Sequence, residues 1–314
     1  MATAVSTPPP DTTPKGPLTS SRDHVTRAEG WRRRGPLLPA LIFLIVVTQI
    51  PFVFTLYYST QSWNLVRPDS RAFVGLDNYV AVFGDSQFWR VTVNTILLIV
   101  GTVLISVLLG LMFALLLDRK FLGRGVVRTL LITPFLVTPV AAALLWKTSL
   151  LSPTNGLVNW ALSPFGIETD WLSEFPLMSV MAELVWQWTP FMMLLILAGL
   201  QMIPGGVYEA ARVDGASRWQ QFVHITLPLV RPALMVAILF RTLDAFRIFD
   251  NPYVMTGGAN DTTSLSMLVS REAIDRVEIG MGSALAVILF LCVLIIAAIF
   301  VKGFKVDLAA GRNN

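Results

Sequence analysis

The chain has 314 residues, of which 54% are hydrophobic and only 14% are charged, and its mean hydropathy is +0.64. A soluble domain carries about 25% charged residues, so this composition excludes an ordinary soluble protein. The apolar residues form continuous runs of bilayer length, whereas a membrane β-barrel shows shorter alternating strands. The composition therefore predicts an all-α polytopic membrane protein.

Residues 1–36 are rich in Pro, Ser and Thr and show no apolar periodicity, so we predict a disordered tail there. Three consecutive basic residues, Arg32, Arg33 and Arg34, precede the first apolar run. A signal peptide has the same order of charge and apolarity, but its apolar core is only about 7–15 residues long. We therefore predict a retained first transmembrane helix, with a cleaved signal as the alternative.

Six apolar runs predict six transmembrane helices, and the third run is interrupted by Pro134 and Pro139. These prolines indicate either a kink that serves packing, which we favour, or a hinge that gates. In the loop before the fourth run, Trp171 is predicted to anchor the chain at the membrane interface. The six predicted spans are 37–58, 91–117, 126–145, 177–200, 233–254 and 281–301.

Six spans divide the remaining segments between two sides of the membrane, and the basic residues are distributed unequally between these sides. They outnumber Asp and Glu in the tail 1–36, the loops 118–125 and 208–232, and the end 302–314. On the opposite side, Asp and Glu outnumber them. The positive-inside rule then predicts that both termini and the loop 208–232 lie in the cytoplasm. We accordingly predict a multi-pass protein of the cytoplasmic (inner) membrane of the cell.

The sequence lacks the residue patterns that several kinds of chemistry require. It contains no glycine-rich phosphate loop, so the chain shows no usual ATP cradle. Its two histidines, His24 and His224, have no partner at metal-ligand spacing, and no nucleophile-elbow pattern is present. We therefore expect no catalytic residue, no metal site and no nucleic-acid partner.

The loop 208–232 carries the most specific pattern in the chain. It begins with good helix formers, is interrupted at Gly215 and continues as an amphipathic helix. It fits the pattern EAA-x3-G-x9-I-x-L-P without a departure, and this resembles the EAA loop in membrane subunits of binding-protein-dependent ABC importers. Flanking motifs resemble the carbohydrate branch, the maltose, trehalose and glycerol-phosphate type. The residues of the loop that carry the resemblance are Glu209, Ala210, Ala211, Asp214, Gly215, Ile225, Leu227 and Pro228.

The resemblance covers roughly residues 37–301 and implies the six-helix fold of type I importer permeases, between cytoplasmic tails 1–36 and 302–314. It implies that the helix through Gly215 is a coupling helix that docks on a cytoplasmic ATPase subunit. It also implies a second homologous permease, two ATPase subunits that bind ATP and Mg²⁺, and an extracytoplasmic solute-binding protein. An amphipathic helix lying on the membrane surface is the alternative interpretation of the loop.

A second group of residues, Arg241, Asp244, Arg247 and Asp250, recurs every third position in the predicted fifth span. Charges at bilayer depth are costly and either pair with each other or face a cavity. This spacing brings neighbouring members to one helical stripe. The group is then an ion-pair ladder, with Asp244 paired to Arg241 or Arg247, or the polar lining of a sugar pathway, and the two interpretations are compatible.

Alignment with maltose-importer permeases through the EAA loop extends this group onto the fourth span. The family's sugar-contacting positions then fall on Leu184, Gln187, Trp188, Phe191, Phe240, Leu243, Asp244 and Arg247. Charged residues stand where the maltose pattern has amides, which argues against maltose itself. We therefore expect a permease subunit of an ATP-driven importer for a di- or oligosaccharide or glycoside. The alternatives are a polyol or glycerol-phosphate cargo and, more remotely, an ion-driven secondary transporter.

Overall fold

The computed structural model describes residues 37–67, 69 and 71–303, so the predicted tails lie outside the described residues except for Lys302 and Gly303. The described chain is helical, with two isolated β-bridges and no extended strand. It divides into two compact units, Met1–Phe52 and Val53–Asn314, and the boundary lies within α2 (Leu38–Tyr58), the predicted first span. The description below concerns the second unit.

Five helices of the described chain are long and apolar enough to cross a membrane, and a sixth span results if one bent pair is counted as one. The second of them starts before the apolar run predicted for this span. Its N-cap is Asp85, whose carboxylate accepts a hydrogen bond from the Gln87 amide at 2.8 Å. The five are α2, α4 (Ser86–Asp118), α9 (Pro176–Gln201), the continuous run Arg218–Ala245 that includes α12 (Leu227–Ala245), and α15 (Ile279–Gly303).

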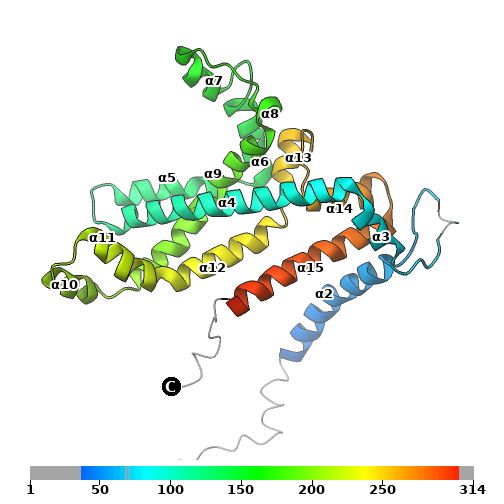
Figure 1. Ribbon diagram of the computed structural model, residues 1–314, viewed down its shortest axis with the longest axis horizontal. Helices are drawn as coiled ribbons and strands as arrows, with labels where there is room; N and C mark the ends of the chain where they lie inside the picture. Colours follow the sequence, from blue (N-terminus) through cyan, green and yellow to red (C-terminus); the bar gives the residue numbers. More distant parts are fainter. Residues whose placement is uncertain (1–36, 68, 70, 304–314) are drawn as a thin grey trace, which may run out of the picture. The chain divides into compact units, whose positions relative to one another are not determined.

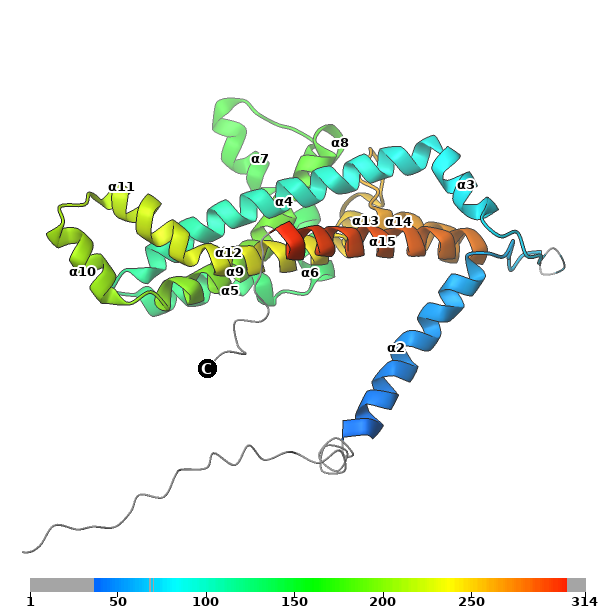
Figure 2. The same ribbon diagram turned by 60° about the horizontal axis from the view of Figure 1, so that its bottom comes forward.

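Helix α9 forms the centre of the second unit and packs against α4, α5 (Arg124–Leu136) and α12 (Figures 1 and 2). Apolar residues lie on most faces of this helix, which is typical of a buried helix. Small residues allow the helices to approach closely: a Cβ added at Gly199 would overlap that of Ala233 on α12. The buried residues Met193, Ile196 and Leu197 fill the same region.

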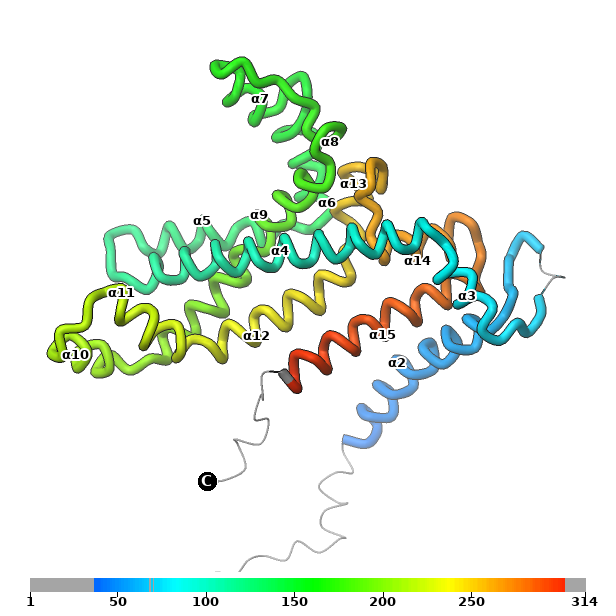
Figure 3. Tube along the Cα trace, viewed as in Figure 1, coloured from blue at the N-terminus to red at the C-terminus, as the bar shows by residue number. Residues whose placement is uncertain are grey.

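The predicted third span is broken rather than kinked. Helix α5 ends at Leu136, α6 (Pro139–Leu145) begins at Pro139, and the two segments are bent by 101°. A residue before proline avoids the helical conformation, and Thr138 is accordingly extended at ψ 145°. Segment α6 continues into a π-helical turn, Trp146–Leu150, so the bend falls in the middle of the apolar run (Figure 3).

The predicted fifth span, 233–254, is wrong at its C-terminal end. The helix that contains it starts at Arg218, in the loop where a second helix is predicted after Gly215, and α12 ends at Ala245, before a separate helix, α13 (Asp250–Thr256). Pro252 cannot donate the hydrogen bond that would continue a helix through this point. Two carbonyls freed by the break accept hydrogen bonds from serines instead: Phe246 from Ser266 at 3.0 Å and Ile248 from Ser264 at 2.5 Å.

Shorter helices complete the unit. Two of them, α14 (Leu265–Ser270) and a π-helical turn, Arg271–Asp275, pack on α15 together with α3 (Asp77–Gly84). The loop before α9 contains α7 (Leu157–Leu162), a 3-10 turn at Ser163–Phe165, and α8 (Trp171–Glu174). Trp171, the predicted interface anchor, is half-buried and donates its indole N–H to Asn159 at 2.7 Å.

Candidate functional site

The segment 205–228, called the motif loop below, folds as two helices around one glycine. Helix α10 (Gly205–Val213) ends two residues before Gly215, whose φ of +78° is readily available only to glycine. The second helix, α11 (Arg218–Gln221), starts with a capping box in which Ser217 and Gln220 bond each other's backbone amides. The predicted order of helix, break and helix is therefore confirmed.

Helix α10 presents two different faces. Ala211 is only 8% exposed, and the hydroxyl of the half-buried Tyr208 lies 3.0 Å from that of Thr226, which holds the helix against the returning chain. Glu209, Ala210 and Val213 lie on the exposed face. Glu209 makes no ion pair with any residue that the structure describes. The outer face is thus free for a partner.

The end of the motif coincides with the junction to the membrane helix. Ile225 is half-buried within a π-helical turn, Phe222–Thr226, and Leu227 and Pro228 are exposed at the start of α12. Pro228 has no N–H for the helical ladder, and the wider π turn lies directly before it. Asp214 is the exposed C-cap of α10. A continuous helical path therefore runs from this junction into the fifth span.

A polar network lies inside the second unit, and we use that name for two bonded groups, one of Glu183, Gln187 and Asn251 and the other of Arg241 and Asp244. Asn251 donates its amide to the Glu183 carboxylate at 2.7 Å and to the Gln187 amide oxygen at 3.2 Å. Gln187 in turn donates to the carbonyl of Val137 at 3.0 Å, at the break between α5 and α6. The network therefore connects α9 with the breaks in both interrupted spans.

Arg241 is completely buried, and its guanidinium contacts the Asp244 carboxylate at 2.9 Å and lies 4.3 Å from the centre of the Trp188 ring. The ion pair between Arg241 and Asp244 that the sequence suggested is confirmed, but the ladder extends no further, because α12 ends at Ala245 and the last two members fall beyond it. Arg247 and Asp250 are exposed and make no ion pair within the described ranges. Only the Arg241–Asp244 pair remains.

An aromatic cluster adjoins this pair. The Phe191 ring lies 5.8 Å from Trp188, 5.4 Å from Phe135 and 5.1 Å from Phe240, measured between ring centres. Phe240 is 53% exposed, and the Asp244 side chain is 31% exposed. Leu243 is half-buried between these two positions on α12. The structure therefore places an open aromatic ring and an accessible carboxylate on one helix.

The predicted pathway residues do not all share this surface. Gln187 is only 3% exposed, and its amide is occupied by Val137 and Asn251. Leu184 is buried as well. Two members of the network, Glu183 and Asn251, were not singled out from the sequence. A carboxylate within the apolar run 177–200 was the available signal, because an ionisable residue in a span usually has a function or a partner.

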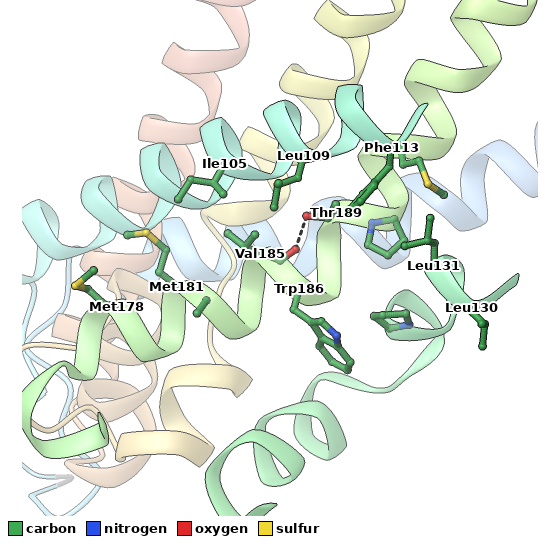
Figure 4. Close-up of a pocket in the computed structure, with 14 residues that line it drawn as sticks. Ile105, Leu109, Phe113, Leu130, Leu131, Met178, Met181, Val185, Trp186 and Thr189 are labelled. Atoms are coloured by element: carbon green, nitrogen blue, oxygen red, sulfur yellow. Dashed lines mark hydrogen bonds between the residues drawn. The ribbon is translucent and has the colours of Figure 1, made fainter. Parts of the chain in front are cut away.

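A neighbouring cavity of about 610 Å³ lies between α4, α5 and α9, on a different stripe of α9 from Gln187, Trp188 and Phe191. Its walls are almost entirely apolar, and Met178, Met181 and Trp186 project from α9 along it (Figure 4). The Thr189 hydroxyl is directed back to the Val185 carbonyl at 2.6 Å. Since it offers few hydrogen-bonding groups, this cavity does not suit a polar solute.

Comparison with known proteins shows the family to which the chain belongs. Residues 77–304 match the binding-protein-dependent transport system inner membrane component family. The chain belongs to this family. It is a multi-pass membrane component of a transport system, which agrees with the five or six spans of the described chain and with the motif loop between two of them.

Relatives within this family extend over nearly the whole chain. The trehalose transport system permease protein SugA of Mycobacterium tuberculosis is 41% identical over 276 residues, which cover 87% of this chain and 89% of that protein. The trehalose/maltose transport system permease protein MalF of Thermococcus litoralis is 39% identical over 272 residues, covering 85% and 91%. A crystal structure of a bacterial ABC transporter involved in the import of the acidic polysaccharide alginate shares the fold, with a TM-score of 0.78, 24% identity, and coverage of 89% and 97%.

Proposed function

We propose that this permease imports a di- or oligosaccharide or a related glycoside through a pathway bordered by Phe240 and Asp244. We infer this class of cargo from the exposed ring of Phe240, which lies on the same helix as the accessible carboxylate of Asp244. The relatives named for trehalose and maltose transport, at 41% and 39% identity, support the same class of cargo.

The chemistry of this surface suits a sugar. A pyranose presents an apolar C–H face, which can lie on an aromatic ring, and hydroxyl groups, which can donate to a carboxylate. The buried guanidinium of Arg241 supports this arrangement from behind, because it contacts both Asp244 and the Trp188 ring. Arg241 therefore positions the carboxylate and does not itself reach the cargo.

A glycerol-phosphate cargo is the alternative that exposed Arg247 favours, since guanidinium groups bind phosphate well. The carboxylates of Asp244 and Asp250 stand in the same stretch of chain and would repel an anion. This charge balance favours the neutral carbohydrate.

The motif loop supplies the proposed connection to ATP. We infer that the loop lies in the cytoplasm and that the exposed face of α10, with Glu209 and Ala210, docks on an ATPase subunit. The complete importer then contains this chain, a second permease, two ATPase subunits that bind ATP and Mg²⁺, and an extracytoplasmic solute-binding protein. Movement of the docked α10 would reach the cargo surface through the continuous helix from Arg218 to Ala245.

The test is uptake into proteoliposomes that contain the chain with its ATPase, permease and binding-protein partners. We expect ATP-dependent uptake of labelled trehalose or another glycoside, and no uptake of glycerol 3-phosphate. Phe240→Ala should raise the half-saturating concentration by roughly fivefold, since one aromatic contact contributes about 1 kcal/mol. Leu229→Ala removes another exposed apolar side chain of α12 and should leave it unchanged.

Two outcomes would overturn the proposal at different points. Uptake of glycerol 3-phosphate in preference to every glycoside would assign the other cargo. Uptake by the chain alone under an ion gradient, without ATPase subunits, would show a secondary transporter.

A further inference from the structure

A second cavity lies behind the motif loop, far along the chain from the proposed cargo surface. Its volume is about 1080 Å³, and its walls come from the C-terminal end of α4, the end of α9, and the helices of the motif loop. Both ribbon views place α10 and α11 beside this end of α4 (Figures 1 and 2). Nothing in the proposed transport cycle requires such a space.

The cavity carries an excess of positive charge. Arg119, Arg212 and Arg218 line it together with one carboxylate, Asp118, so three positive charges face one negative charge. All four side chains are exposed, and none makes an ion pair within the part of the chain that the structure describes. Three unpaired guanidinium groups around one hollow are suited to an anion with several oxygen atoms, since guanidinium binds phosphate in a bidentate manner.

The other walls are apolar. Leu115 and Leu200 come from the ends of two membrane helices, and Phe222 from the motif loop. The Trp219 ring lies 5.7 Å from that of Phe222 and is 70% exposed. A tryptophan beside arginines at the end of an apolar span is typical of the membrane–water interface. The cavity thus combines a cationic rim with an apolar wall at the level where lipid headgroups lie.

We propose that this cavity binds a phospholipid with an acidic headgroup. The phosphate and headgroup would meet Arg119, Arg212 and Arg218, and an acyl chain would lie along Leu115, Leu200 and Phe222. A free phosphate would contact the arginines but not the apolar wall, so the apolar wall favours a lipid as the molecule that carries the phosphate. The assignment depends on where the apolar part of α4 ends and not on which side of the membrane the loop occupies.

The site is separate from the face proposed to dock on the ATPase. Tyr208 and Arg212 are four residues apart, so they share one face of α10, and both line the cavity. Glu209, Ala210 and Val213 are exposed and do not line it. A lipid bound to Arg212 and Arg119 would therefore connect α10 to α4 from the inner side and leave the outer face free.

The test is native mass spectrometry of the full-length chain, purified in a neutral detergent and titrated with phosphatidylglycerol or phosphatidylcholine. We expect a phosphatidylglycerol adduct that binds at least tenfold more tightly than phosphatidylcholine. Arg119→Gln and Arg218→Gln should each weaken it about fivefold, as expected for one basic residue near an anionic lipid. Arg128→Gln also removes an exposed positive charge, but outside the cavity, and should change binding less than twofold.

Three results would overturn the proposal. Equal binding of the two lipids would remove the role of headgroup charge. An equal loss in Arg128→Gln would indicate general attraction to the basic surface and no defined site. Displacement of phosphatidylglycerol by millimolar inorganic phosphate would identify a free anion, and not a lipid, as the ligand.

Discussion

The motif loop and the polar network use polar residues in opposite ways. In the motif loop, Glu209 and Asp214 are exposed, and the turn between the helices is formed by Gly215 and its immediate neighbours. In the network, Glu183 is completely buried, and its hydrogen bond to Asn251 joins residues 68 positions apart. The motif loop keeps its carboxylates available to a partner, whereas the network uses the buried carboxylate of Glu183 to join distant segments.

The difference indicates which property each region controls. A span with a broken helix leaves carbonyl groups without partners, and these must be satisfied by neighbouring side chains in the membrane. Gln187 does this for Val137, and Ser264 and Ser266 do so for the break after α12. Substitutions in the network should therefore lower stability, whereas substitutions on the outer face of the motif loop should alter transport alone.

The largest loss of stability is expected from Asp244→Asn. This change leaves the fully buried Arg241 guanidinium without its ion-pair partner. An unpaired buried charge costs about 3 kcal/mol, so the melting temperature of the purified protein should fall by several degrees. Asp250→Asn removes an exposed carboxylate that has no ion pair in the described chain, and it should melt like the unchanged protein.

This comparison also separates two roles of Asp244. If Asp244→Asn melts normally but loses cargo uptake, the carboxylate acts on cargo and the ion pair is not needed for folding. If both properties fall together, the pair is needed to hold the cargo surface in place.

A smaller loss is expected from Asn251→Leu. The change removes one donor that serves both Glu183 and Gln187, and it leaves a buried carboxylate without that bond. Since hydrogen bonds to charged groups contribute about 2 kcal/mol, we expect a clear but smaller fall in melting temperature. Asn94→Leu is the matched control, because Asn94 is half-buried on α4 with no side-chain bond to the described residues. Equal melting of the two variants would contradict a bracing role for Asn251.

Local signals explain why the motif loop could be predicted from the sequence. Its helix, glycine break and second helix depend on neighbouring residues, such as the capping box of Ser217 and Gln220. Four spans, α2, α4, α9 and α15, were likewise predicted at the correct places, since long apolar runs leave little alternative in a membrane.

The breaks could not be predicted in the same way. A proline shows where a helical hydrogen bond is lost, but not whether the helix bends slightly or turns by 101°. That outcome depends on a donor being available elsewhere, as Gln187 is for Val137, 50 residues away. For the same reason the sequence suggested a four-residue charge ladder, although the helix ends before Arg247 and Asp250.

A still smaller effect is expected from Gln187→Leu. The side chain is of similar length, but it cannot donate to the Val137 carbonyl, which then lacks that partner at the α5–α6 break. Hydrogen bonds within membrane proteins contribute about 1 kcal/mol or less, so the expected fall in melting temperature is correspondingly small. Gln201→Leu, at the exposed end of α9, is the control.

Combining Gln187→Leu with Asn251→Leu tests whether the network acts as one unit. The two residues share a hydrogen bond of 3.2 Å, so the double variant should lose less stability than the sum of the single losses. Strictly additive losses would mean that the two breaks are held independently.

The smallest effect on stability, with the clearest effect on transport, is expected from Glu209→Lys. Glu209 is exposed, and its side chain has no hydrogen bond or ion pair to the described residues, so melting should not change. A reversed charge on the proposed docking face should nevertheless prevent ATP-driven uptake, because charge reversal at an interface sets like charges against each other. Lys120→Glu reverses another exposed charge of the same predicted side, outside the motif loop, and should retain uptake. Normal uptake by Glu209→Lys would contradict docking through this face of α10 and would favour the alternative in which the helix lies on the membrane surface.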